Sequence, residues 1–480
     1  MNYANWGTLA SRWFLALTIC LGANTMVYAQ RWSGADSFGG VGSDFGIDIK
    51  INQAGEYLTG YFSDSVTFGN TTLVSAGGTD IFLAKFSRWA VQIGGASTDQ
   101  PTNLALDGAG NIYLTGWFTS SAAFHSTKGS SVTATGNGET SFLAKYSSSG
   151  VLQWVQTGVG TDGLNDRGYG VAVDTATGAV YWTGFTMLGT TFSSANGSSY
   201  TVPGPWVWHM YLVGYDADGN FQWGESNSAS PNSISDKVAV GPDGDVYATG
   251  WFEGVVTFYS ADGHNQTITG LSGPVQSPPD YPGDGFVVKY DSNGNLKWVN
   301  DIGGYKANMN DIVVSSSGLV SVTGLIGNID GNAQQQETLV LSQPPGDPIN
   351  LGGGIYTTPY NQDVIVATYN ESGVALSAHR IGGAANEEGD AIVSSGNDLY
   401  VLEMLEDTDN LAIFKLADDM VDWTIEGGGN SLSSETWNRM TLAPDGRIVA
   451  VGGFTGTATF GWFTLTSQGG TDGYVVNLAP

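Results

Sequence analysis

The chain has 480 residues and carries 16 Lys and Arg against 45 Asp and Glu, which gives a net charge of −29 at neutral pH. This charge excludes a basic nucleic-acid-binding protein, because phosphate would repel it. Glycine accounts for 70 residues, about twice the usual share, and hydrophobic residues make up 41%. The apolar content excludes a disordered chain, and the glycines, which lack a three-residue period, are typical of turns between short strands.

The first 29 residues have the pattern of a signal peptide. Arg12 precedes an apolar run from Trp13 to Ala23, and a polar segment then ends at Ala29, which predicts cleavage before Gln30. The apolar run is too short to span a bilayer, which takes roughly 20 residues. Cys20 lies inside the run, so we expect a mature chain without disulfides. From the signal-peptide pattern we also expect that the mature chain has no transmembrane segment and is exported to the periplasm, the cell surface or the medium.

An internal repeat organises residues 30–480. The segment 111–118, which reads Asn-Ile-Tyr-Leu-Thr-Gly-Trp-Phe, has close copies at 56–62 and 245–252. The glycine of its Thr-Gly pair marks five copies, at Gly60, Gly116, Gly184, Gly250 and Gly324, with steps of 56, 68, 66 and 74 residues. Two degenerate copies follow, through 399–416 and 448–478, so we count seven.

Each copy predicts four strands. In chain order these are an alternating apolar strand, a second strand with the Thr-Gly marker, a third strand such as 142–146, and a fourth strand with a tryptophan. Tight turns with Gly and Asp or Asn join the strands, and no window has helical periodicity. The sequence therefore predicts an all-β fold, a seven-bladed β-propeller of four-stranded antiparallel blades. A β-helix would need shorter copies, and sandwich domains would need longer ones.

The two ends of the repeat region complement each other. The last copy ends after its third strand, and the segment 30–34, Gln-Arg-Trp-Ser-Gly, is similar to 87–91 in the fourth strand of the first copy. We therefore expect the N-terminal segment to supply the outer strand of the last blade. This strand would close the ring and make residues 30–480 a single domain.

The repeat resembles the SBBP-type β-propeller repeat of bacteria. The residues that carry the resemblance are the strand and turn pattern of 93–118 and the Gly-Gly-Thr-Asp-Ile-Phe-Leu-Ala-Lys-Phe pattern of 76–86. The resemblance implies a propeller in an exported bacterial protein. It implies no single activity.

Catalytic and cofactor motifs are absent from the sequence. The histidines fall in four different copies without a shared spacing, at His125, His209, His264 and His379. No nucleophile elbow, phosphate loop or zinc spacing occurs. We therefore predict no catalytic residue, no metal site and no cofactor, and an enzyme is the less favoured hypothesis.

Calcium is the one cation for which the sequence offers candidates. The turns 216–220 and 291–295 resemble calcium loops but lack the bidentate glutamate, and we interpret them as structural. Acids also recur before the first and third strands, where we expect them to bind loop amides, with a bound cation as the alternative. They are Asp44, Asp48, Asp80, Asp99, Asp166, Asp236, Asp284, Asp311, Asp363, Asp390, Glu435 and Asp472.

Tryptophans recur after the third-to-fourth-strand turns. A repeated tryptophan at a fixed place in the repeat is expected to pack between neighbouring blades. The residues concerned are Trp154, Trp223, Trp298 and Trp423.

The connection between the second and third strands lengthens along the chain. It spans 20 residues from Gly60 to Asp80, 34 from Gly250 to Asp284 and 39 from Gly324 to Asp363, and the third copy inserts 203–209. We expect these loops to emerge on one face of blades three to five and to form a binding surface there. Its predicted residues are Trp206, Trp208, Asp280, Tyr281, Asp347, Tyr356 and Tyr360, with Asp284 at the rim.

These observations favour an exported, monomeric binding or interaction module with a glycan or protein ligand. Aromatic platforms suit both ligand classes. The alternatives left open are a polysaccharide lyase or hydrolase that uses the same face, and a structural component of the cell surface.

Overall fold

The structure is a computed structural model of the chain. It describes residues 30–161, 163–204, 206–230, 232–270, 283–303, 306–327, 340–341, 349–350, 362–382, 386–405, 408–417, 420–429, 432 and 438–480. All regular elements within these residues are strands, and none is a helix, so the prediction of an all-β fold is confirmed. The predicted signal peptide and Glu435 lie outside the described residues.

The strands form antiparallel units of four. The first unit consists of β2 (Asp44–Asn52), β3 (Gly55–Phe62), β6 (Asp80–Lys85) and β7 (Trp89–Gly94), paired in that order. The second consists of β8 (Asp99–Leu106), β9 (Ile112–His125), β10 (Ser131–Tyr146) and β11 (Leu152–Gly160). The third consists of β12 (Arg167–Val173), β13 (Val180–Thr186), β16 (His209–Tyr215) and β17 (Phe221–Ser230).

The later units repeat this order. The fourth consists of β18 (Ser233–Val240), β19 (Val246–Phe252), β22 (Asp284–Tyr290) and β23 (Leu296–Gly303). The fifth consists of β24 (Lys306–Val314), β25 (Val320–Gly327), β28 (Gln362–Tyr369) and β29 (Ala375–Ile381). The sixth consists of β30 (Glu387–Ser395), β31 (Asp398–Leu405), β32 (Asn410–Ala417) and β33 (Met420–Gly427).

The last sheet joins the two ends of the chain. Its order is β34 (Arg439–Leu442), β35 (Ile448–Phe460), β36 (Phe463–Leu478) and β1 (Trp32–Phe38). Strand β1 pairs with β36 from Trp32 opposite Leu478 to Phe38 opposite Gly473. One buried cluster, which includes Phe38, Ile49 and Val451, is shared between this sheet and the first unit.

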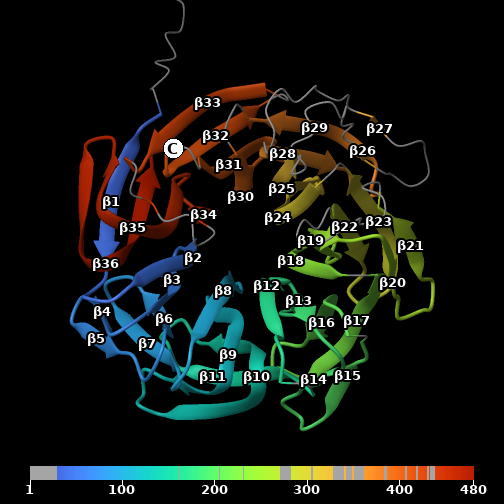
Figure 1. Cartoon of the computed structure of the whole chain (residues 1–480), viewed down its shortest axis with the longest axis horizontal. Coiled ribbons are helices and arrows are strands. Elements are labelled where there is room, and N and C mark those ends of the chain that lie inside the picture. The colour runs from blue at the N-terminus through green and yellow to red at the C-terminus, as the bar shows by residue number, and fades with distance from the viewer. Residues whose placement is uncertain are drawn as a thin grey trace, which may run out of the picture.

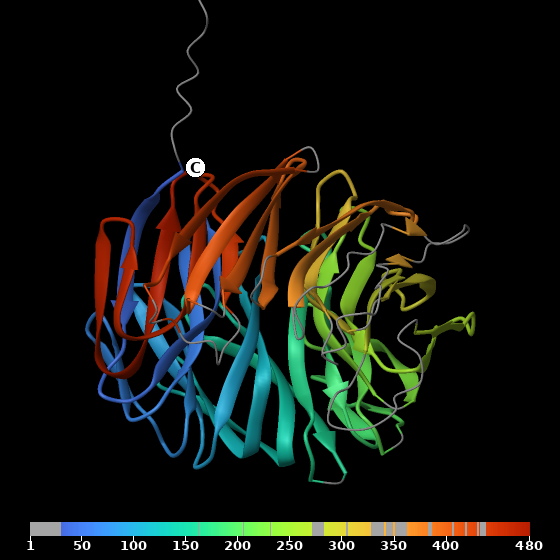
Figure 2. The same cartoon turned by 45° about the horizontal axis from the view of Figure 1, so that its top comes forward.

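The units follow one another around a ring (Figure 1). The first strand of each unit lies nearest the centre and the fourth lies outermost, and the strands of neighbouring units stand side by side (Figure 2). The buried clusters span neighbouring units: Leu143 of the second unit packs in one cluster with Trp182 and Tyr211 of the third. The core is therefore a series of layers between sheets.

Both residues of the Thr-Gly marker are required by contacts with neighbouring strands, the glycine with the first strand and the threonine with the third. A β-bulge in the first strand brings a carbonyl against the marker glycine, and a Cβ on Gly60 would lie 1.8 Å from the Phe45 carbonyl oxygen. The threonine before it, Thr59, donates a hydrogen bond to the Phe82 carbonyl of the third strand at 2.8 Å. Thr115, Thr183, Thr249 and Thr323 donate equivalent bonds.

A triplet of tyrosine, lysine and tryptophan occupies directly paired positions on the second, third and fourth strands. In the fourth unit it is Tyr247, Lys289 and Trp298, and the ammonium of Lys289 lies 5.1 Å from the centroid of the Tyr247 ring. The other complete triplets are Tyr57–Lys85–Trp89, Tyr113–Lys145–Trp154 and Tyr400–Lys415–Trp423. The third unit has Tyr181, Gly214 and Trp223 at these positions.

The triplet fastens one unit to the next, at what we call a joint. Lys289 and Trp298 each donate a hydrogen bond of 3.1 Å to the Glu371 carbonyl in the β28–β29 turn of the fifth unit. A Cβ on Gly373 of that turn would be 2.8 Å from the Trp298 ring. The interpretation of the tryptophans as residues between blades is therefore confirmed here, as it is for Trp154 against Ala217 and Trp223 against Ser292.

Two units have none of the three residues of the triplet. The fifth has Ser321, Thr368 and Ser377 at the three positions, and the last sheet has Val449, Asn477 and Gly34. The sequence alignment of Trp32 with Trp89 is therefore wrong by two residues, because Gly34 occupies the tryptophan position. Trp32 instead donates to the Glu426 carbonyl of β33 at 3.0 Å and so contacts the sixth unit.

Candidate functional site

The predicted binding surface is described only in the third unit. Trp206, between β15 (Ser199–Val202) and β16, is 69% exposed, and Trp208 is half-buried. Asp280, Tyr281, Asp347, Tyr356 and Tyr360 lie outside the described residues, so their grouping with the tryptophans stays a prediction. Asp284, expected at the rim of the surface, is buried, because it begins β22 inside the sheet.

Buried aromatic rings support this exposed tryptophan segment. The ring of Trp208 lies 5.7 Å from Phe185, whose ring lies 5.5 Å from Tyr169. The main chain of Trp208 is held at both ends, since its N–H donates to the Asn232 side chain at 3.2 Å and its carbonyl accepts the Ser233 N–H at 2.9 Å. The segment that presents Trp206 is therefore anchored on both the side-chain and the main-chain level.

Two buried titratable side chains lie beside this anchor. Asn232 donates to the buried carboxyl of Glu253 at 3.2 Å, and burial raises the pKa of Glu253 to about 7 although that hydrogen bond opposes the shift. His209 is also buried, which lowers its pKa, and its Nδ1 lies 3.1 Å from the Val207 carbonyl. Both side chains are enclosed, so they brace the segment and do not reach a ligand directly.

A paired cation flanks the same end of the sheets. The Arg167 guanidinium lies 4.6 Å from the Trp117 ring centroid, and its Nε and Nη2 donate to Glu139 at 2.6 and 2.9 Å. Arg167 also interacts with Tyr169, which belongs to the aromatic stack below Trp208. Aromatic and charged groups thus meet between the second and third units.

The long connections do not all stay on that face. Hairpins in them fold back along the outer strand of the preceding unit: β14 (Thr190–Ser193) pairs with β11, β20 (Val255–Phe258) with β17, and β26 (Val340–Leu341) with β23. The tips reach the third-to-fourth-strand turn of their own unit, as when the Ala195 N–H donates to Gly219 and the Ala261 N–H to Gly294. Part of the extra length of these connections therefore stabilises the contact between neighbouring units. The lengths of the connections in the sequence did not predict this role.

The recurring acids hold loops. Asp44, Asp80, Asp99 and Asp472 each accept the backbone N–H of the residue four positions earlier, at 2.8 to 2.9 Å. The turn acids Asp216 and Asp291 accept N–H groups within their own turns. The expectation that acids at these positions bind loop amides is therefore confirmed for these six residues. No group of three or more metal-ligating side chains occurs in the described part of the chain, and calcium binding stays untested.

Charged side chains also meet on the first strands, nearest the centre of the ring in Figure 1. Lys237 of β18 is 4% exposed, and burial lowers its pKa to about 7, with Arg439 acting in the same direction and Asp311 and Asp48 opposing it. Asp48 accepts the Leu104 N–H of the next unit at 2.8 Å. Lys237 donates to the Tyr169 carbonyl at 3.3 Å and Asp48 pairs with Lys50 at 3.0 Å, so both buried charged groups have polar partners within the protein.

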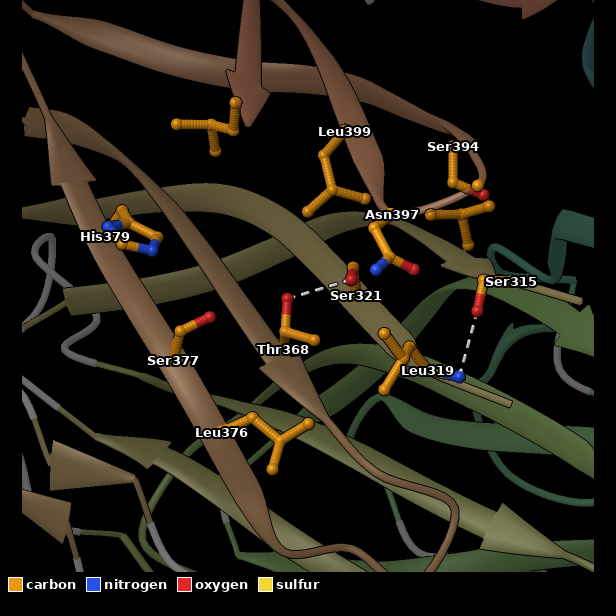
Figure 3. A pocket seen from close by; sticks show the side chains of 13 residues that line it. Ser315, Leu319, Ser321, Thr368, Leu376, Ser377, His379, Ser394, Asn397 and Leu399 are labelled. Carbon is orange, nitrogen blue, oxygen red and sulfur yellow. Dashed lines mark hydrogen bonds between the residues drawn. The ribbon is translucent and has the colours of Figure 1, made fainter. Parts of the chain in front are cut away.

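A pocket of about 240 Å³ lies at the joint between the fifth and sixth units (Figure 3). Ser321, Thr368 and Ser377 of the fifth unit line it together with Asn397 and Leu399 of the sixth. It lies toward the end of the strands where the first-to-second and third-to-fourth turns are found, opposite the predicted binding surface. Sequence reasoning missed it, although a column-by-column alignment of the triplet positions would have revealed it.

Comparison with known proteins identifies one copy of the repeat. Residues 88–119 match the family model described as SBBP, β-propeller repeat, so the resemblance seen in the sequence is confirmed and the chain carries a β-propeller repeat.

Individual relatives are distant. An uncharacterized WD repeat-containing protein of Acanthamoeba polyphaga mimivirus is 26% identical over 187 residues, which cover 38% of this chain and 12% of that protein. Virginiamycin B lyase from Staphylococcus aureus is 11% identical, with a TM-score of 0.23 over 65% of this chain and 94% of that one. Among the described residues, no helix has the length and apolar character needed to cross a membrane.

Proposed function

We propose that residues 30–480 form one seven-bladed β-propeller, closed by β1, that is exported after removal of residues 1–29 and acts as a binding module. Two features support the architecture: the repeat match at 88–119 and the pairing of β1 with β36. Two features of the sequence support export: the charged, apolar and polar segments before Gln30, and a mature chain free of cysteine.

Trp206 is the observation that carries the binding function. Trp206 is 69% exposed and so contributes little buried area to the fold, although tryptophan is usually buried. The segment around it is nevertheless anchored through Trp208 and Asn232. A large, rigid aromatic side chain of this kind binds partners at low entropic cost. The surface we propose extends from Trp206 over the second-to-third-strand connections of the third to fifth units.

The ligand we propose is a glycan or a protein, either neutral or cationic. The chain has a net charge of −29 and would repel polyanions. Sugar rings and apolar protein side chains both pack on exposed indole faces.

A glycan array probed with residues 30–480 tests this function, followed by a pull-down against extracellular protein if no glycan binds. Trp206→Ala should reduce binding at least 10-fold. Trp462→Ala is the matched control, because Trp462 is 94% exposed but lies between β35 and β36 of the last sheet. Release of a shortened glycan would instead identify a lyase or hydrolase, and unchanged binding by Trp206→Ala would reject the proposed surface.

A further inference from the structure

The pocket at the joint between the fifth and sixth units exists because three large side chains are replaced together. Ser321, Thr368 and Ser377 occupy the paired positions that Tyr247, Lys289 and Trp298 occupy in the fourth unit. Directly paired residues on neighbouring antiparallel strands point to the same face of the sheet. All three losses therefore open the same space, which is the space that an aromatic layer fills at the preceding joint.

The inner part of the pocket is polar and buried. Ser321 is 2% and Thr368 9% exposed, and their hydroxyl oxygens lie 2.9 Å apart in a hydrogen bond (Figure 3). A hydroxyl offers one donor and two acceptor positions, so this pair retains hydrogen-bonding capacity toward the pocket. The side chains of Ser377 and Asn397 also line the space, and neither has a recorded hydrogen bond to another described residue.

Part of the wall is apolar, and no lining residue carries a fixed charge. Val313, Leu319, Leu376, Leu399 and Leu416 supply the apolar part of the lining. No Asp, Glu, Lys or Arg occurs among the described residues that line the pocket, and His379 is the one aromatic ring. A charged ligand would lose its hydration without gaining a counter-charge, so the lining favours an uncharged one.

We propose that this pocket binds a small, uncharged aromatic compound that carries an N–H or O–H group, such as an indole or a phenol. Such a compound reproduces the missing tryptophan and tyrosine rings: its ring lies against the leucines, and its polar group bonds to Ser377, Asn397 or the Ser321–Thr368 pair. An engineered protein cavity of about 150 Å³ with apolar walls is known to accept benzene. The site lies on the opposite side from Trp206 and is independent of the proposed function.

Titration of the mature chain with indole, followed by calorimetry and by ligand-observed NMR, tests this site. We expect saturable binding to one site. Ser377→Trp restores the side chain found at the preceding joint and should weaken indole binding at least 10-fold, because the new ring occupies the pocket. Ser372→Trp makes the same change at an exposed turn position outside the lining residues and should leave binding unchanged.

A second variant tests the site even if Ser377→Trp does not fold. Asn397 is exposed at the edge of the pocket, so Asn397→Ala leaves the core intact and should weaken indole binding about 3-fold or more. Failure of indole and phenol to bind the native chain would overturn the proposal, as would unchanged binding by both pocket variants. Preferential binding of an uncharged sugar, with glucose as the probe, would also overturn it.

Discussion

Two consecutive joints of this ring are built in opposite ways. At the joint between the fourth and fifth units, Lys289 and Trp298 fill the space and both bond to the Glu371 carbonyl. At the next joint, Ser321, Thr368 and Ser377 stand at the same paired positions and leave a pocket. The strands on either side keep the same order and pairing, so the architecture does not depend on filling every joint.

The difference separates two contributions to the fold. Strand pairing within each unit and the marker Thr-Gly set the geometry, and these are present at both joints, as Thr249 and Thr323 show. The triplet adds burial and hydrogen bonds between units. A joint that lacks it becomes a place where a ligand can supply the missing contacts.

The largest expected effect comes from removing β1, the outer strand of the last sheet. Deletion of residues 30–40 removes β1, exposes the edge of β36 and removes Trp32, which is 4% exposed. Loss of one buried tryptophan side chain alone costs about 3–5 kcal/mol, so we expect at least this loss in the free energy of unfolding, measured by urea denaturation. A melting temperature within a degree of that of the mature chain would contradict closure by β1.

Trp298→Ser should convert the filled joint into an open one. The tryptophan is 4% exposed, so the change should lower the free energy of unfolding by about 3–5 kcal/mol. It should also create a second site for indole, detectable as a doubled stoichiometry in the titration. A loss below 1 kcal/mol would show that the triplet contributes little to the joint.

Two turn glycines provide a matched pair across the joints. Gly373 and Gly396 have φ angles of 81° and 63°. An alanine in this left-handed conformation lowers the free energy of unfolding by about 1–2 kcal/mol at either position. A Cβ at Gly373 would also press on Trp298, whereas a Cβ at Gly396 would meet nothing within 4 Å. Gly373→Ala should therefore destabilise the chain by at least 1 kcal/mol more than Gly396→Ala in urea denaturation.

The joint between the last sheet and the first unit should respond to pH. Burial raises the pKa of Asp44 from 3.8 to about 7, with the Gly40 N–H opposing the shift. The stability that this carboxyl contributes is therefore fully present below about pH 4 and is lost as the pH rises through about 7. We expect a higher melting temperature at pH 5 than at pH 8.

The Asp44 contribution can be isolated by substitution. Asp44→Asn should reduce the loss of unfolding free energy between pH 5 and pH 8, by about 1.4 kcal/mol for each pKa unit that lies in this range, while Asp218→Asn, at an exposed turn position, should leave the loss unchanged. A melting temperature of the native chain that rises from pH 5 to pH 8 would contradict the assignment.

Calcium should have the smallest effect. If the repeated acids only brace loops, adding calcium to chelated protein should leave the melting temperature unchanged. A site filled at 100 times its dissociation constant would add about 2.7 kcal/mol, so a clear rise would show that a cation belongs to the structure.

The repeated parts of this fold were predictable from the sequence, and the exceptions were not. The Thr-Gly marker predicted the second strands because it recurs, and the structure explains it through the bulge at Phe45 and the bond from Thr59. The alignment of Trp32 was wrong because Trp32 stands before the fourth-strand bulge, where other units have Leu152 or Leu296, and Gly34 stands after it, where they have the tryptophan.

The candidate sites were predictable only in part. Trp206 was identified as an exposed aromatic residue on a loop, and the structure bears this out. Loop length could not distinguish a binding loop from a hairpin that braces a neighbouring unit, such as β20 with β21 (Gln266–Thr269), because both are insertions at the same point. The pocket escaped prediction because it arises from an absence, visible only when Ser377 is compared with the tryptophans of the other units.

The most direct test is the free energy of unfolding of Ser377→Trp, measured without ligand. It shows whether the joint between the fifth and sixth units has room for the tryptophan that the preceding joint contains. Fully burying a large apolar side chain contributes about 1.5–3 kcal/mol, so the account predicts that the variant is more stable than the native chain by about 1–2 kcal/mol. A loss of 1 kcal/mol or more, the usual result of overpacking a filled core, would contradict it.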